Sequence, residues 1–308
     1  MEEKYYTVDE TDKGKRMDKF LSDKGGENAS RSYFQKLIKE EKVLVNGTSV
    51  KSNYKVNVGD EITVYIPKPQ PAKILPENIP LDIVYEDEDV ILINKPKGMV
   101  VHPAPGHYSG TLVNALMYHC KDNLSGINGV LRPGIVHRID RDTTGIIIAC
   151  KNDMAHNSLA RQLKEHSITR KYNAIVYHCM KETEGTIHKP IGRHPVDRKK
   201  MSTRAKVSKD AITHYRVLEN MPKGYAHIEC QLETGRTHQI RVHMAEINHP
   251  LVGDTVYGPA KDKFHLEGQA LHARVFGFVH PKTGEYMEFE APLPKYFEKL
   301  LQKLRNGV

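Results

Sequence analysis

A proline-rich stretch at residues 67–80 divides the chain into a short and a long part, and this division constrains the fold more than any other feature. Five of its 14 residues are proline, in the sequence PKPQPAKILPENIP. Proline removes a backbone donor and disfavours helix in the residue before it, so neither a helix nor a central strand can run through this stretch. We interpret it as a semi-rigid linker between two domains. The chain length of 308 residues agrees with two domains.

Residues 14–66 have the pattern of a small α/β domain. Apolar spacing predicts two short helices, and Ser30 is a good N-cap for the second. A strand then runs into Asn46-Gly47, the dipeptide that most strongly indicates a β-hairpin. Alternating apolar residues between positions 56 and 64 predict further strand segments with a turn between them.

Residues 81–300 alternate strand-like and helix-like segments. We expect strands at 83–85, 90–93, 145–149, 172–177 and 226–232, and helices at 112–120, 155–165, 239–247 and 296–304. Strand hairpins mixed with separate helices favour an α+β fold over a doubly wound parallel sheet.

The composition is that of a globular protein, with 39% hydrophobic and 27% charged residues. No run of about 18 apolar residues occurs, as a transmembrane helix would need. The first residues, MEEKYYTVDE, lack the basic start and apolar run of a secretory signal, so we expect a cytoplasmic protein. The four cysteines form no CxxC pair, and we expect reduced, mostly buried thiols.

The net charge of +8 belongs entirely to the long part of the chain. Residues 1–66 contain 12 basic and 12 acidic residues, whereas the whole chain contains 46 and 38. A basic excess suits an anionic partner. Its distribution does not by itself identify the short domain as the part that binds such a partner.

The densest polar cluster lies at residues 134–145, in the sequence GIVHRIDRDTTG, just before an apolar strand. Its side chains include His137, Arg138 and Asp140, which cannot be buried at low cost unless they are paired. Loops at strand ends are common sites of chemistry. A salt-bridged surface loop explains the same composition equally well.

A second cluster lies at residues 233–243, in the sequence ETGRTHQIRVH. Arg236, His238 and Arg241 could together hold phosphates or a carboxylate. His238 and His243 are a poor metal site, because a spacing of five does not place them on one helix face and no carboxylate completes the ligand set.

The segment from His137 to Gly145 resembles the HRLD…TG signature of the RluA family of pseudouridine synthases, with Ile139 where leucine is usual. Four further segments agree with the family in the same order, and together they cover about residues 81–295: NKPKGMVVHP at 94–103, RKY at 170–172, GRTHQIRVH at 235–243 and LHA at 271–273. The resemblance implies a catalytic domain whose mixed, mostly antiparallel central sheet is flanked by helices. It also implies an isomerase that converts uridine to pseudouridine without a cofactor.

The resemblance assigns the catalytic carboxylate to Asp140, with Asp142 as the competitor within the same segment. An ionised aspartate can add to the sugar, attack the base ring or remove the C2′ proton, and all three roles are open. By family position, Arg241 should pair with Asp140, and a bidentate pair would fix the carboxylate. Tyr172 should lie against the base, and Leu271 should form an apolar wall against water; by composition alone both are ordinary core residues.

Residues 16–64 resemble an S4 RNA-binding module, in which Arg31 and Lys36 could line one helical face toward RNA. An S4 module joined to this catalytic domain is most similar to the RluD type, which acts on large-subunit ribosomal RNA. Arg138, beside the aspartate, could fill the space that a flipped base leaves. Arg236 and His238 are further candidates for RNA binding.

We therefore expect the partner to be structured RNA, in the large ribosomal subunit or its precursor particle. We expect no membrane, no metal and a monomeric protein. Two rival interpretations are open: a non-catalytic RNA-binding ribosome assembly factor, and a metal-dependent hydrolase that uses His137, Asp140 and His238.

Overall fold

The computed structural model describes residues 2–25, 30–67, 74–104, 107–121, 123–129, 132–197, 199–261 and 263–307. The chain forms two compact units, Met1–Ala72 and Lys73–Val308. Most of the predicted linker's first half lies outside the described residues. Residues 74–80 pack onto the larger unit: Ile74 is buried in its core, and the Leu75 carbonyl accepts a hydrogen bond from Asn114.

The smaller unit packs two helices on a four-stranded sheet. Its elements are β1 (Glu2–Thr7), α1 (Met17–Lys24), α2 (Arg31–Lys39), β2 (Val43–Val45), β3 (Thr48–Ser49) and β4 (Glu61–Ile66), with strand order β1-β4-β2-β3. Ser30 caps α2 by accepting a hydrogen bond from the Tyr33 amide, as predicted. Asn46 and Gly47 both have positive φ, the conformation that a tight hairpin turn requires.

The larger unit contains four helices among its described residues. They are α3 (Leu112–Cys120), α4 (Asp153–Lys164), α5 (Gln239–Glu246) and α6 (Lys295–Arg305). Its strands are β5 (Ile83–Glu86), β6 (Val90–Lys95), β7 (Thr144–Cys150), β8 (Thr169–Tyr177), β9 (Glu184–His188), β10 (Ile191–Arg193), β11 (Met201–Ser202), β12 (Ser208–Lys209), β13 (Ile212–Met221), β14 (Tyr225–Leu232), β15 (Leu271–Val279) and β16 (Tyr286–Glu290).

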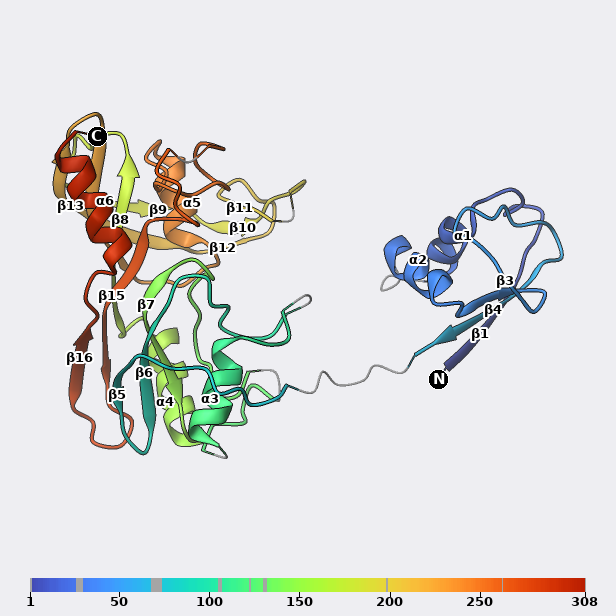
Figure 1. Ribbon diagram of the computed structural model, residues 1–308, viewed down its shortest axis with the longest axis horizontal. Coiled ribbons are helices and arrows are strands. Elements are labelled where there is room, and N and C mark those ends of the chain that lie inside the picture. The colour runs from blue at the N-terminus through green and yellow to red at the C-terminus, as the bar shows by residue number, and fades with distance from the viewer. Residues whose placement is uncertain are drawn as a thin grey trace. The chain divides into compact units, whose positions relative to one another are not determined.

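Most of these strands form one mixed sheet in the order β5-β6-β7-β15-β8-β14-β13-β9, and β16 pairs with β15. Every neighbouring pair in it is antiparallel except β7 and β15, which are parallel. The predicted α+β fold with a mostly antiparallel sheet is confirmed. A separate small sheet, β11-β10-β12, lies beside α5. Figure 1 shows α3 and α4 beside β5–β7, with α5 and α6 at the opposite end of the large sheet.

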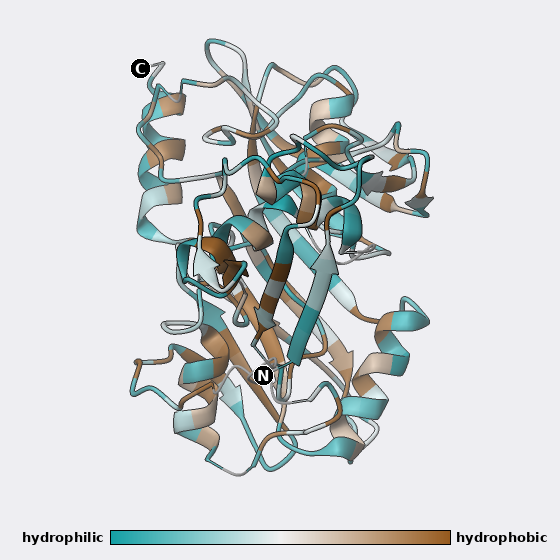
Figure 2. Cartoon of the chain, turned by 90° about the vertical axis from the view of Figure 1, so that its right-hand side faces the viewer, coloured by the Kyte–Doolittle hydropathy of each residue, from teal (hydrophilic) through white to brown (hydrophobic). Residues whose placement is uncertain are grey.

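Helices cover both faces of the large sheet. On one face, Leu116 of α3 and Ile240 of α5 share a core with Ile93 and Ile147. On the other face α4 and α6 pack, α6 through a stripe of Phe297, Leu300, Leu301 and Leu304. Figure 2 shows α6, next to the C-terminus, with hydrophobic residues along one side and hydrophilic residues along the other. The pocket described below opens between strands of this sheet and α5.

All the helices predicted for the larger unit are present within a few residues of their expected bounds. Several strands were not predicted, namely β1, β9 to β13, β15 and β16. Of the strand segments and turn expected between positions 56 and 64, the structure contains the turn, where the Asp60 carboxylate accepts the Asn57 amide, and the strand after it, β4, which begins at Glu61. Within the described residues, every helix is too short or too polar to cross a bilayer.

Candidate active site

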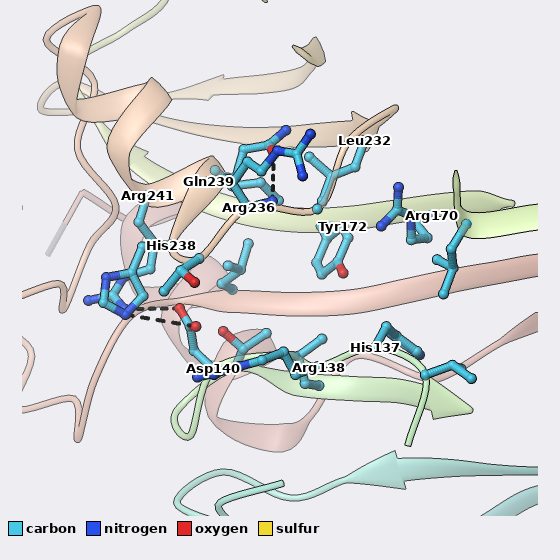
Figure 3. A pocket seen from close by; sticks show the side chains of 18 of the residues that line it. His137, Arg138, Asp140, Arg170, Tyr172, Leu232, Arg236, His238, Gln239 and Arg241 are labelled. Atoms are coloured by element: carbon cyan, nitrogen blue, oxygen red, sulfur yellow. Dashed lines mark hydrogen bonds and ion pairs between the residues drawn. The ribbon is translucent and has the colours of Figure 1, made fainter. Parts of the chain in front are cut away.

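A pocket of about 470 Å³ lies where the loop before β7 meets the N-terminal end of α5. Asp140, Tyr172, Arg241 and Leu271 all line it, so four segments distant in sequence converge there. Figure 3 shows Asp140 pointing toward His238 and Arg241, with Tyr172 farther along the same pocket.

Asp140 is held by an arginine that has a second, fully buried partner. Arg241 Nη1 donates to Asp140 Oδ2 at 2.9 Å. The bidentate contact goes to Asp254, with Nε to Oδ2 at 2.6 Å and Nη2 to Oδ1 at 3.0 Å. The expected ion pair between Arg241 and Asp140 is therefore present, but the expected bidentate geometry is wrong for this pair: Asp140 receives one hydrogen bond, from Nη1, and the bidentate contact goes to Asp254.

The charge on Arg241 is secured by this double pairing. Burial lowers the pKa of the Arg241 guanidinium, but the hydrogen bonds and charges of Asp254 and Asp140 outweigh burial and raise the pKa above its ordinary value. The Asp140 side chain keeps 18% of its surface exposed, whereas that of Asp254 is wholly buried. Of the two carboxylates, Asp140 is the one that a ligand can reach.

Backbone contacts fix the loop that carries Asp140. The buried Lys95 ammonium donates to the Arg141 carbonyl at 2.8 Å and to the carbonyls of Pro96 and Met99. Gly145 pairs with Ala273 on β15 so closely that a Cβ at Gly145 would lie 2.1 Å from the Ala273 carbonyl oxygen. The lysine of the NKP segment and the glycine of the TG segment therefore have structural roles, which position the polar loop.

Tyr172 and Leu271 lie on neighbouring strands. In the register of β8 and β15, Ala273 lies opposite Tyr172 and Leu271 opposite Ala174. Both side chains are buried and line the pocket. Burial raises the pKa of the Tyr172 hydroxyl, which keeps it protonated at neutral pH. The two side chains form an apolar wall with one hydroxyl along the pocket.

Cations occupy much of the remaining pocket lining. Arg138 is exposed, and no ion pair or hydrogen bond within the described part of the chain engages its guanidinium. Arg236 donates from Nε to the Asp210 carbonyl. Arg170 is buried; its Nη2 donates to the Glu233 carbonyl, and its Nε has no partner among the described residues. Arg138 and Arg236 thus lie at the rim, whereas Arg170 brings a positive charge to the buried part.

The two histidines of the hydrolase hypothesis have different surroundings. His137 Nε2 accepts the Ile148 amide, and its ring stacks on Phe276. His238 is half-buried, and its Nε2 lies 3.9 Å from Asp140 Oδ1. A backbone amide occupies the Nε2 atom of His137, and within the described residues these two histidines and Asp140 are not among the groups whose ligand atoms lie close enough to share a metal ion.

The predicted RNA-binding residues of the smaller unit lie on α2. Arg31 donates to the buried Asp18 carboxylate at 3.1 Å, together with Arg16 and Gln35. These hydrogen bonds outweigh burial and lower the pKa of Asp18 to about 2. Lys36 is exposed, with a weak 3.8 Å contact to Glu40. Arg31 therefore has a structural contact, and Lys36 is free to meet an anion.

Sequence reasoning missed Asp254 and Tyr257, which support the pocket from behind. Tyr257 contacts His238 through its hydroxyl and lies with its ring 5.2 Å from the Arg241 guanidinium. Both residues come from a segment without helix or strand, between α5 and β15. The segment PLVGDTVYG offered a weak signal, a lone acid and a tyrosine between glycines.

Comparisons with known proteins agree with this site. A sequence model described as RNA pseudouridylate synthase matches residues 89–246, and one of the S4 domain matches residues 15–62. The protein named uncharacterized RNA pseudouridine synthase YlyB of Bacillus subtilis is 54% identical, over 98% of both chains. Ribosomal large subunit pseudouridine synthase D of Escherichia coli is 41% identical over 97% of this chain and 93% of its own.

A solved structure supports the fold independently. The structure of human RNA pseudouridylate synthase domain containing 1 superimposes with a TM-score of 0.57 at 24% sequence identity. It covers 78% of this chain and 98% of that one. At this identity the similarity is one of fold.

Proposed function

This chain belongs to the RNA pseudouridine synthase family and is an isomerase, and from that premise we propose that it converts specific uridines of large-subunit ribosomal RNA to pseudouridine. The two relatives above, one of them named for the large ribosomal subunit, support this choice of substrate. The observation that carries the proposal is the exposed edge of the Asp140 carboxylate, held by Arg241 at 2.9 Å in a pocket otherwise lined largely by cations and apolar groups.

The reaction breaks the N1–C1′ bond, rotates the base and joins C5 to C1′, while C5 loses a proton and N1 gains one. It has no net oxidation or hydrolysis. Asp140 would act as the carboxylate that adds to the sugar, attacks the base or removes the C2′ proton. Arg241 orients it through the hydrogen bond from Nη1. Leu271 would exclude water, and Tyr172 would stack on the base. To accept the C5 proton late in the reaction, Tyr172 would first have to give up its own hydroxyl proton, which its burial opposes.

Positive side chains lie both at the rim of the pocket and in its buried part, and each position suits a different part of the substrate. Arg138 and Arg236 at the rim would meet phosphates, and Arg138 would fill the space of the flipped nucleotide, whose extrusion costs a few kcal/mol. The buried Arg170 lacks a carboxylate partner among the described residues, which suits the negative charge that uracil gains when it leaves C1′.

We assign RNA binding also to the smaller unit, as an S4 domain at residues 14–66, followed by the linker 67–80 and the catalytic domain 81–300. Lys36 on the exposed face of α2 and Arg31 would contact RNA there. We propose that the protein works as a monomer. A ribosomal substrate would place this work in the cytoplasm.

The test is tritium release from RNA that carries C5-labelled uridine. Asp140→Asn should abolish release while RNA affinity stays within about twofold, because the substitution keeps the shape and removes the reactive charge. Asp142→Asn is the matched comparison, since the Asp142 carboxylate pairs with the neighbouring Arg141. Wild-type turnover by the Asp140 variant would refute the assignment.

The rival function, a non-catalytic assembly factor, makes a different prediction in the same assay. It requires RNA binding without tritium release by the wild-type chain. The presence of Asp140, Tyr172 and Arg241 in one pocket disfavours it.

A further inference from the structure

A chain of hydrogen bonds ends beside Asp140 and has no role in the function proposed so far. The Met201 amide of β11 donates to the Tyr257 hydroxyl at 2.7 Å. The same hydroxyl lies 2.8 Å from His238 Nδ1. His238 Nε2 in turn lies 3.9 Å from Asp140 Oδ1.

These contacts favour the tautomer of His238 that carries its hydrogen on Nε2. The Tyr257 hydroxyl accepts from Met201, so its own hydrogen is available for Nδ1 of His238. Burial raises the pKa of Tyr257 to about 12, so the hydroxyl keeps that hydrogen. Burial also lowers the pKa of His238, more than the nearby Asp140 charge raises it. A neutral imidazole that accepts at Nδ1 carries its hydrogen on Nε2, and this N–H faces Asp140.

The distance between His238 Nε2 and Asp140 Oδ1 limits which chemical groups can bind between them. A distance of 3.9 Å is too long for a direct hydrogen bond. One oxygen atom about 2.8 Å from both atoms would bridge them. It must accept from Nε2–H and donate to the Asp140 carboxylate, so a hydroxyl or a water fits, whereas a carbonyl oxygen cannot donate.

We propose that His238 binds the 2′-hydroxyl of the target ribose and so holds the sugar against Asp140. The inference rests on the proposed function. Within an RNA chain the 3′ and 5′ oxygens of a uridine are esterified, and uracil has no hydroxyl. The 2′-hydroxyl is thus the one hydroxyl that an internal uridine offers, and it lies on the carbon next to C1′, where the bond breaks. His238 would also favour RNA over DNA at this site.

The test compares full-length enzymes on two forms of one short RNA, with either a 2′-hydroxyl or a 2′-fluorine at the target uridine. Fluorine cannot donate to Asp140 and accepts poorly from His238. Replacing the 2′-hydroxyl with fluorine should lower the kcat/KM of the wild type. The fold decrease should be about ten times larger than the one that the same replacement causes in His238→Ala, since the variant has already lost this hydrogen bond. The intrinsic effect of fluorine on the chemistry cancels in this comparison.

Two further variants separate hydrogen bonding from structure. His238 has a φ of 57°, so alanine and glutamine bear a similar backbone cost there. His238→Gln restores an N–H donor and should recover part of the sensitivity to the 2′ group, whereas His238→Ala should not. Tyr257→Phe keeps the ring near Arg241 but frees the His238 tautomer, and should lose part of that sensitivity. His119→Ala, on α3, is the control expected to behave as wild type.

The possible results of these experiments distinguish the inference about His238 from the proposed function. Equal fluorine effects in wild type and His238→Ala would overturn the inference and indicate that water occupies the gap. Unchanged kcat/KM in His238→Ala would overturn it as well. No product from wild type on the 2′-hydroxyl RNA would contradict the proposed function, and this inference with it.

Discussion

Asp254 fixes the orientation in which the Arg241 guanidinium meets Asp140. It is wholly buried and accepts four hydrogen bonds, two from Arg241 and one each from the amides of Val256 and Tyr257. Through these bonds it ties the arginine to a rigid turn. The guanidinium then turns its Nη1 end toward Asp140, to which Nη1 donates. We regard Asp254 as a positioning residue, since it lies behind Arg241 and out of reach of a ligand.

Asp254→Asn should therefore lower kcat by tenfold or more with a smaller change in KM, since about 1.4 kcal/mol of lost orientation is a tenfold rate change. Breaking a buried ion pair should also reduce the free energy of unfolding by about 3 kcal/mol. Steady-state kinetics measures the change in kcat and KM, and thermal unfolding measures the change in stability. Asp82→Asn, an exposed residue bonded to Asn94, is the control. A variant with wild-type kcat would exclude Asp254 from a positioning role.

Substitution of Gly145 tests whether β7 and β15 must approach closely next to the loop that carries Asp140. Its φ of 106° is unfavourable for other residues, and a Cβ would clash with the Ala273 backbone. We expect Gly145→Ala to cost about 2–5 kcal/mol of unfolding free energy. Gly126→Ala, which would meet nothing within 4 Å, should cost little. Thermal unfolding compares the two, and similar melting temperatures would show that β7 and β15 can separate without penalty.

At the scale of residues, the sequence indicated Asp140, Tyr172, Arg241 and Leu271 because each belongs to a short motif. It could not indicate that Asp254 takes the bidentate contact of Arg241, since the two lie 13 residues apart in different elements. Pairing of this kind depends on how the segment after α5 folds back, and no local pattern encodes that.

At the scale of elements, the small sheet β10-β12 concentrates the charge of the chain. Residues 193–209 contain seven lysines and arginines and one aspartate, hence +6 of the net +8. This sheet is joined to α5: Ile191 packs against Val242, and Thr203 donates to Glu246. The positive charge of this stretch is evident from the sequence, but its strands are not, because they are two or three residues long, too short for an alternating pattern.

We predict that this sheet binds the RNA backbone. Replacing Lys199, Lys200 and Lys206 with glutamine should weaken RNA binding about tenfold or more near 0.1 M salt and reduce the salt dependence by about 0.7–0.9 for each phosphate that is no longer neutralised. The value of kcat at saturating RNA should not change. The same replacement at Lys295, Lys299 and Lys303, exposed on α6, removes equal charge elsewhere and is the control. Equal weakening in both triple variants would mean that only net charge matters.

At the scale of the whole molecule, the described hydrophobic cores each draw on one unit only. Phe20, Leu37 and Val64 belong to a core within residues 8–64, and the four other cores lie within residues 74–304. The proline-rich stretch predicted this division, because it interrupts both helical and strand patterns. The sequence did not reveal that β1 completes the smaller sheet, since Glu2–Thr7 is mostly exposed and carries no apolar alternation.

Separate cores predict separate unfolding. Phe20 is fully buried in the smaller unit, and Phe20→Ala should cost that unit about 3–5 kcal/mol. Calorimetry should then show one transition moved to lower temperature and a second unchanged, because the core around the catalytic pocket contains no residue of the smaller unit. Phe297→Ala, at a fully buried position on the inner face of α6, should move the other transition instead. A shift of both transitions by either variant would contradict this prediction and show that the two units unfold as one.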